Sequence, residues 1–197
     1  MKRFLVTCSI ALIATNLQAQ TKDAKWNVGI VAGITQYKGS LGNNFYKFNS
    51  QMNVVTGASV TRYISEQIDV NLLVARGGLG INKNNTHFVN YFSTALLSVR
   101  LYLLNRNAVV KPYLMVGAGT LFYDKNSNIK SDIINIMAPS YGGGVNINLS
   151  SSVRLNFQEG FHHTKADKID IDIPNEKATF LFHTIGVSLD LPSKSRK

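Results

Sequence analysis

The residues with the greatest chemical potential are two adjacent histidines, His162 and His163, near the end of an alternating segment. Imidazole nitrogens bind metals and act as general acids or bases. Neighbouring residues of a β-strand point to opposite faces, so the two rings could share one ion only if the strand ended before them. We therefore expect histidines of a loop or a membrane interface, with neither a metal nor a cofactor.

A second candidate is the stretch that follows, in which Asp167, Asp170 and Asp172 lie among lysines. Such carboxylates could bind calcium, but an EF-hand loop also needs a correctly spaced glycine and a distal bidentate glutamate. Here Glu176 follows Pro174, and the glycine is missing. The segment is better interpreted as a solvated loop of mixed charge.

The single cysteine, Cys8, lies in a segment that is typical of a secretory signal peptide. A basic start is followed by an apolar stretch and by small and polar residues around Ala19 and Gln20 that would allow cleavage. Acylation of Cys8 as in a lipoprotein is disfavoured, because cleavage there would leave almost no apolar region. We predict a signal peptide over residues 1–20, and hence a mature chain without thiol chemistry or disulfides.

The charge of the chain is strongly basic, with 21 Lys and Arg against 11 Asp and Glu. Nucleic-acid-binding proteins gather such charge on one face or along one helix. The only concentrated basic run here is the tail with Lys194, Arg196 and Lys197. Because the chain is also expected to be exported, we predict no nucleic-acid partner and a basic periplasmic tail over residues 192–197.

The elements that must position these groups are β-strands, since apolar and polar residues alternate with period two. Between Phe88 and Leu103, odd positions such as Leu97 and Val99 are apolar, whereas even positions such as Ser98 and Arg100 are polar. Each such strand has one apolar and one polar face. Eight strands are predicted, over residues 26–35, 51–63, 68–80, 88–104, 110–123, 140–150, 153–163 and 178–191.

Longer loops and short turns alternate between these strands, with long loops around residues 36–50, 124–139 and 164–177, a loop of moderate length at 82–87, and tight turns at 65–67, 105–107 and 151–152. After residue 20 no apolar stretch is long enough for a membrane helix. An even number of strands with this loop pattern is typical of outer-membrane barrels, because strands can cross a bilayer only as a closed ring. We predict an all-β fold, an eight-stranded antiparallel up-and-down transmembrane β-barrel over residues 21–191. A soluble, lipocalin-like barrel is the alternative.

Aromatic residues near the predicted strand ends are expected at the two membrane interfaces, where rings with an apolar body and a polar edge are favoured. These residues are Trp26, Tyr63, Tyr102, Tyr113, Phe122, Tyr123, Phe161 and Phe180.

Glycines and aromatic residues recur, together with a few neighbouring residues, in three parts of the chain. The residues concerned are Trp26, Gly29, Gly33, Tyr37, Gly39, Gly42 and Phe45, then Lys111, Pro112, Tyr113, Gly117 and Gly119, then Phe161, His162, Ile185, Gly186 and Val187. In these residues the chain resembles OmpA-type outer-membrane barrels over about the whole mature length. The resemblance implies the fold and location of that family rather than an activity. Only the N-terminal barrel of the family is expected, because its soluble peptidoglycan-binding domain has no counterpart after Leu191.

The polar faces of eight strands would line a lumen that side chains nearly fill. Charged groups buried there need partners, so we expect Arg100 and Arg154 to bond with Asp69 or Asp190 and to form a polar plug. A gated pathway for small solutes is the alternative. The predicted lumen network consists of Asp69, Asn71, Arg100, Lys111, Asn146, Asn148, Arg154, Gln158 and Asp190.

His162, Thr164 and Asp167 resemble in composition the His, Ser and acidic residues of two barrel-enzyme families that modify lipids. Threonine stands in place of serine and no second element supports a triad, so we expect no enzyme. The sequence predicts a non-enzymatic, monomeric protein of the cell outer membrane with a structural or surface-interaction role. Its partners would be outer-membrane lipid, lipopolysaccharide and a surface partner that meets the long loops. A lipid-modifying barrel enzyme or a narrow small-solute channel is the alternative.

Overall fold

The computed structural model describes residues 26–38, 46, 52–83, 86–104, 108–124, 134–164 and 179–192. The predicted signal peptide lies outside these residues, as does the predicted basic tail apart from Pro192. Among the described residues, no helix is both long and apolar enough to cross a membrane.

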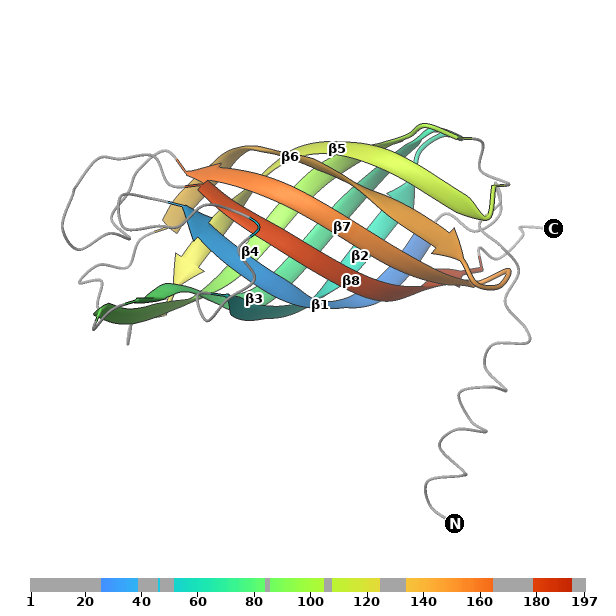
Figure 1. Ribbon diagram of the computed structural model, residues 1–197. Helices are drawn as coiled ribbons and strands as arrows, with labels where there is room; N and C mark the ends of the chain where they lie inside the picture. The colour runs from blue at the N-terminus through green and yellow to red at the C-terminus, as the bar shows by residue number, and fades with distance from the viewer. Residues whose placement is uncertain are drawn as a thin grey trace, which may run out of the picture.

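Eight strands make up the described part of the chain (Figure 1). They are β1 (Trp26–Lys38), β2 (Asn53–Tyr63), β3 (Ile68–Lys83), β4 (Thr86–Tyr102), β5 (Val110–Tyr123), β6 (Ile134–Asn148), β7 (Val153–Thr164) and β8 (Thr179–Leu191). Each strand pairs antiparallel with the next, and β8 pairs with β1, so the sheet closes on itself. The predicted eight-stranded antiparallel up-and-down barrel is confirmed.

The register of the strand pairs determines how the strands tilt. Starting at Trp26 and following the paired residues once round the barrel leads back to β1 at Gln36, from position 26 to position 36. Strands with such a stagger are tilted by roughly 35–45° from the barrel axis, and Figure 1 shows all eight slanting across it. The stagger brings side chains that are far apart in sequence to the same height inside the barrel.

The end of the barrel where β1 begins and β8 ends carries the tight turns predicted at residues 65–67 and 151–152, whereas the turn predicted at 105–107 lies outside the described residues. After β2, the backbone nitrogens of Ile64 and Ser65 donate to the carbonyl of Ile68 at 3.1 and 3.0 Å. After β6, the backbone nitrogen of Val153 donates to Ser150 Oγ at 3.1 Å. These short connections therefore satisfy their own backbone N–H groups within the turns.

At the opposite end, the hairpin of β3 and β4 is longer than the sequence indicated. β3 and β4 remain paired as far as Lys83 and Thr86, and their hairpin projects beyond the neighbouring strands in Figure 1. Residues 82, 83, 86 and 87 were predicted as part of a loop, because their polar side chains interrupt the alternation. Strand pairing continues there because it depends on backbone hydrogen bonds to the adjacent strand, which do not require alternating side chains.

The sixth strand begins at Ile134, six positions earlier than predicted, so the long loop predicted over residues 124–139 is shorter. Pro139 lacks a backbone donor, which favoured a loop assignment. The structure accommodates this proline at an irregularity, where the β5–β6 register shifts between Gly117 and Gly119 and the β6–β7 register shifts between Met137 and Ser140. Strand pairing resumes beyond this bulge.

Candidate functional site

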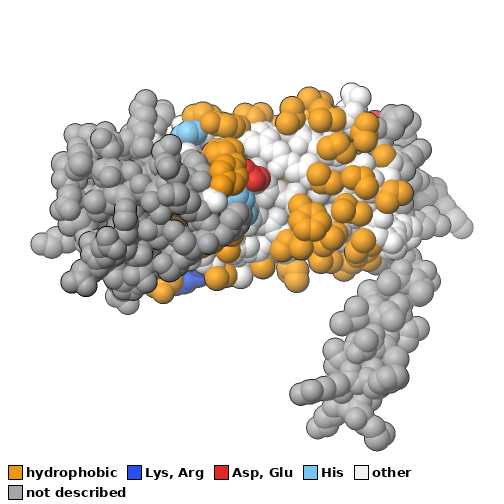
Figure 2. Space-filling model, viewed as in Figure 1, with side chains coloured by type: hydrophobic (Ala, Val, Ile, Leu, Met, Phe, Trp, Pro, Cys, Tyr) orange, Lys and Arg blue, Asp and Glu red, His pale blue; other side chains and the backbone are white. Residues whose placement is uncertain are grey.

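The outer surface of the barrel is a belt of apolar side chains. On β4 the odd residues Leu97, Val99 and Leu101 are 56%, 44% and 45% exposed, whereas Ser98 and Arg100 between them are buried. Figure 2 shows apolar atoms covering much of the described surface on the face that β7 and β8 turn to the viewer. Such a continuous apolar surface is unstable in water and suits contact with lipid.

The interior is divided into two parts of different chemistry. Toward the end where β1 finishes and β8 begins, the inward side chains form an apolar cluster in which the rings of Phe92 and Phe182 stack with centroids 5.8 Å apart. The buried members of this upper cluster are Tyr37, Val55, Leu73, Ala75, Leu79, Phe92, Leu96, Leu121, Met137, Phe180 and Phe182. The sequence interpretation expected a polar lumen throughout and missed this cluster, although Phe92 and Leu96 share the parity of Ser98 and Arg100.

Below the upper cluster lies an ion pair between β7 and β8. Arg154 Nη2 is 2.7 Å from Asp190 Oδ2, and Asn27 Nδ2 donates to Asp190 Oδ1 at 2.8 Å. All three residues are buried. Because each carboxylate oxygen accepts a hydrogen bond, the negative charge of Asp190 is balanced and solvated by protein groups. Asp190 was one of the two acids named from the sequence as partners for the arginines.

The other arginine bonds to an amide rather than to a carboxylate. Arg100 Nη2 donates to Gln158 Oε1 at 2.7 Å, and its guanidinium lies 4.9 Å from the centre of the Tyr113 ring. Asp69 is opposite Arg100 in the β3–β4 ladder and fully buried. The stagger of the strands directs the guanidinium across the lumen toward β7, which sequence parity alone could not show.

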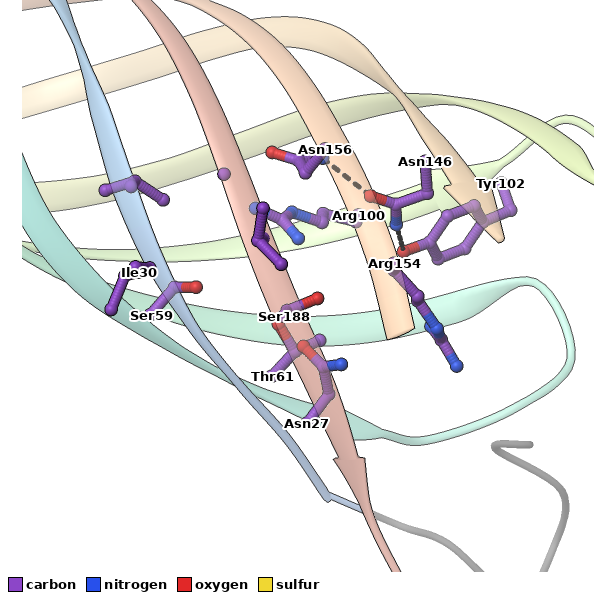
Figure 3. A pocket seen from close by; sticks show the side chains of 13 residues that line it. Asn27, Ile30, Ser59, Thr61, Arg100, Tyr102, Asn146, Arg154, Asn156 and Ser188 are labelled. Atoms are coloured by element: carbon purple, nitrogen blue, oxygen red, sulfur yellow. Dashed lines mark hydrogen bonds between the residues drawn. The ribbon is translucent and has the colours of Figure 1, made fainter. Parts of the chain in front are cut away.

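A chain of hydrogen bonds continues from Gln158 through two tyrosines. Gln158 Oε1 also accepts from Tyr113 Oη at 3.0 Å, and Tyr113 Oη accepts from Asn156 Nδ2 at 2.8 Å. Asn156 Nδ2 lies 2.6 Å from Asn146 Oδ1, and Asn146 Nδ2 donates to Tyr102 Oη at 2.6 Å. Figure 3 shows Asn156, Asn146 and Tyr102 joined in this order. The chain links β4, β5, β6 and β7 across the interior.

The two tyrosines correct the expectation for aromatics at strand ends. Tyr102 and Tyr113 are 5% and 2% exposed and point inward, as do Tyr63, Tyr123 and Phe180 from their strand positions. Trp26, Phe122 and Phe161 face outward as expected of interface residues. The sequence did indicate this direction. Residues two or four positions apart in a strand share a face, so Tyr102 lies on the same face as Ser98 and Arg100, and Tyr113 on the same face as Lys111.

The remaining predicted network residues occupy the same polar half. Asn71 Nδ2 donates to Thr61 Oγ1 at 2.8 Å, and buried Lys111 has its Nζ 5.9 Å from the Tyr102 ring centre. Asn148 is only partly buried and donates to the Ala108 carbonyl at 3.1 Å, so it lies at the rim rather than in the lumen. The structure therefore places eight of the nine predicted network residues in the buried polar interior.

Little space remains among these side chains. The cavity lined by Arg100, Tyr102, Asn146, Arg154 and Asn156 has a volume of about 10 Å³ (Figure 3). A single water needs roughly 10–15 Å³, so this part of the described interior has room for about one water. Above it, the side chains of the upper cluster pack against one another inside the barrel.

The two histidines lie on opposite faces of β7. His163 faces outward, where its ring nitrogens are 3.1 Å from Tyr141 Oη and 2.9 Å from Thr179 Oγ1. His162 is fully buried, 4.4 Å from the Phe182 ring centre, and both of its ring nitrogens lack a hydrogen-bond partner among the described residues. The expectation of a loop or interface position is therefore wrong for His162, because β7 continues to Thr164 with inward even positions.

In the described part of the chain, no group of three or more His, Cys, Asp or Glu side chains is placed to hold a metal ion. Asp167, Asp170, Asp172 and Glu176 lie outside the described residues, and with them the acidic loop and the third member of the His162, Thr164 and Asp167 set.

Comparison with known proteins identifies the family. The sequence profile of the outer membrane protein beta-barrel domain matches residues 5–191. The chain belongs to this family. It is accordingly a protein of the cell outer membrane, which agrees with its apolar belt. No curated protein sequence matches it significantly.

Solved structures of this outer-membrane barrel fold cover most of the chain. Neisserial surface protein A is 17% identical, with a TM-score of 0.55, over 84% of this chain and 97% of its own. Ail, the attachment invasion locus protein of Yersinia pestis, is 12% identical, with a TM-score of 0.52, over 86% and 99%. The N-terminal barrel of Pseudomonas aeruginosa OprF is 12% identical, with a TM-score of 0.51, over 84% and 97%. These similarities show the fold, and the resemblance to the barrel of OmpA-type proteins is confirmed.

Proposed function

We propose that this outer-membrane barrel is a non-enzymatic, sealed platform that displays its long connections at the cell surface. The observation that carries the proposal is the two-part filling of the lumen. Hydrogen-bonded charges and amides occupy the half nearest the tight turns, and stacked aromatic and aliphatic side chains occupy the other half. A filled lumen lets the barrel anchor loops without creating a leak.

The polar half supports this role by its bonding. Removing a buried charge from its partner is strongly destabilising, so Arg154 and Asp190 hold β7 and β8 together from within. Arg100 connects β4 to β7 in the same way through Gln158. Cross-lumen bonds of this kind resist flattening of the barrel and hold the strands in place relative to one another.

The surface role concerns the end opposite the tight turns. The connections there span residues 39–52, 124–133 and 165–178, and the β3–β4 hairpin ends at the same end of the barrel. We propose that a monomeric barrel presents these segments to lipopolysaccharide and to a surface partner. Loops on a rigid scaffold are the usual place for recognition in such folds.

Conductance in planar bilayers tests the sealed platform. The purified mature chain is expected to give no stepwise ion currents beyond the protein-free baseline, and Phe92→Ala together with Phe182→Ala is expected to open a measurable conductance. Discrete channel openings by the unmodified protein would favour the narrow channel instead. Hydrolysis of outer-membrane lipids by the pure protein would favour a lipid-modifying enzyme.

A further inference from the structure

A polar cluster interrupts the apolar belt on the lipid-facing side of β7 and β8. Along β7 the outward side chains Phe157, Glu159 and Phe161 follow one another, so a carboxylate stands between two aromatic residues. Glu159 is paired in the ladder with His183 of β8, and Glu159 Oε2 is 3.4 Å from His183 Nδ1. Ionisable groups that face lipid are rare and generally have a function.

Two further residues define the geometry of the cluster. The backbone nitrogen of Tyr46 donates to Gln36 Oε1 at 3.0 Å, which identifies this atom as the amide oxygen. His183 Nε2 lies 3.3 Å from the same oxygen. Both ring nitrogens of His183 therefore lie against oxygen atoms that can accept a hydrogen bond.

The carboxylate of Glu159 retains capacity for another donor. The Tyr46 hydroxyl donates to Glu159 Oε1, and His183 lies against Oε2. The Glu159 side chain is nevertheless 41% exposed, and an ionised carboxylate has about four acceptor positions. The hydrogen bond to Glu159 raises the pKa of the Tyr46 hydroxyl above its usual value, so this hydroxyl stays protonated at neutral pH.

Glu159 and His183 form one end of an apolar groove on the outer surface. The groove is shallow and open to the surroundings, with a volume of about 640 Å³. Its walls come from β1, β6, β7 and β8, and Gly143 on the outward face of β6 leaves part of its floor without a side chain. The residues that define it here are Ile34, Gly143, Val145, Phe157 and Ile185. Figure 2 shows an acidic and a histidine patch on this face, beside a pale area and between apolar areas.

We propose that this groove binds one membrane lipid, with an acyl chain along the apolar floor and a cationic, N–H-bearing head group on Glu159. The occupant is an acyl lipid because the groove opens from the lipid-facing belt. A donor-bearing cation fits because the exposed acceptor is a carboxylate and the described residues that line the groove include no lysine or arginine. Among these described residues, a phosphate group would lack the basic side chains that usually bind it.

Lipid retention from membranes of defined composition tests the proposal. The mature chain is placed in nanodiscs of phosphatidylethanolamine and phosphatidylcholine with identical acyl chains, and retained lipids are counted by native mass spectrometry. Both head groups are cationic at nitrogen, but only the first has N–H donors. We expect retention of phosphatidylethanolamine to exceed that of phosphatidylcholine about tenfold, which corresponds to about 1.4 kcal/mol.

Two variants and one control assign the effect to the groove. Glu159→Gln should remove the preference, and Val145→Trp should reduce retention of both lipids because the larger ring fills the floor. Asp124→Asn alters another carboxylate, which pairs with Arg76 elsewhere on the barrel, and should leave the preference unchanged. A heat-modifiability gel establishes that each variant is folded before its lipids are counted.

Three results would overturn the proposal. One is equal retention of the two lipids by the unmodified protein. Another is an unchanged preference in folded Glu159→Gln. The third is stronger retention of phosphatidylglycerol than of phosphatidylethanolamine, which would assign an anionic head group to the histidine. None of these results depends on whether the lumen conducts, so the sealed platform is tested separately. If Glu159→Gln does not fold, the unmodified protein and Val145→Trp still decide.

Discussion

Arg154 and Asp190 form a buried ion pair between adjacent strands, with Nη2 and Oδ2 2.7 Å apart and 6% and 2% of their side chains exposed. The two residues are not directly opposite in the ladder, since Arg154 is paired with Ser188 and Asp190 with Asn27. The guanidinium reaches along β8 toward the strand end to meet the carboxylate. This reach joins β7, β8 and β1 at the place where the barrel closes.

Replacing only one partner of this ion pair should lower the stability of the barrel more than replacing both. Arg154→Met is expected to lower the free energy of unfolding by about 3–5 kcal/mol, because Asp190 stays buried without the guanidinium that balances its charge. The double variant Arg154→Met with Asp190→Asn should recover part of this loss. Urea unfolding of the barrel in lipid measures both effects. A double variant as unstable as the sum of the single ones would show that the two side chains act independently.

The apolar belt predicts a depth dependence for charges on β4. Val99→Arg, toward the middle of the belt, should cost roughly 2–4 kcal/mol, whereas Leu103→Arg, just past the end of the strand, should cost about 0–1 kcal/mol. Both side chains face outward and are about half exposed, so they differ mainly in depth. The yield of heat-modifiable barrel and its unfolding in urea are the measurements. Equal losses for the two variants would place the belt elsewhere on the strand.

Two adjacent glycines on β6 should respond differently to a methyl group. A Cβ on Gly142 would overlap the carbonyl oxygen of Glu159, whereas a Cβ on Gly143 has its nearest atom, the Tyr113 oxygen, at 3.0 Å. Gly142→Ala is therefore expected to destabilise the barrel by about 1–3 kcal/mol through backbone displacement. Gly143→Ala should cost clearly less. Reversal of this order in unfolding measurements would contradict the close approach of β6 and β7.

His162 should be dispensable for stability. Its ring is buried in an apolar setting without hydrogen-bond partners among the described residues, and an unsatisfied buried polar group costs about 1–3 kcal/mol. His162→Leu is expected to raise the free energy of unfolding by up to that amount. His163→Leu, on the outer face of the same strand, serves as the comparison and should change stability little. A large loss of stability in His162→Leu would show that the ring has an essential partner.

Much of this protein was determined by the sequence itself. Period-two alternation predicted the strands and which faces of them are polar or apolar, because a pleated strand points successive residues to opposite faces. Leu97 and Val99 face lipid and Ser98 and Arg100 face inward, as expected. The same rule placed His162 and His163 on opposite faces.

Other features were decided only by the tertiary structure. Parity says that a side chain points inward but not which strand it meets, since that depends on the stagger of the closed sheet. Arg154 therefore reaches Asp190, whereas Arg100 reaches Gln158. Pro139 could be accommodated in a strand only because β5 and β6 shift register beside it.

The residues of the site were likewise determined partly by the sequence and partly by the tertiary structure. The polar residues near the tight turns were named from the sequence, but the upper cluster and the outward Glu159 and His183 were not. Phe92, Leu96 and Phe182 sit on inward positions of strands that are apolar on both faces there, and alternation carries no signal where both faces are apolar. Glu159 and His183 are 24 positions apart and become a pair only when β7 and β8 align, because register is a property of the folded sheet and not of either segment.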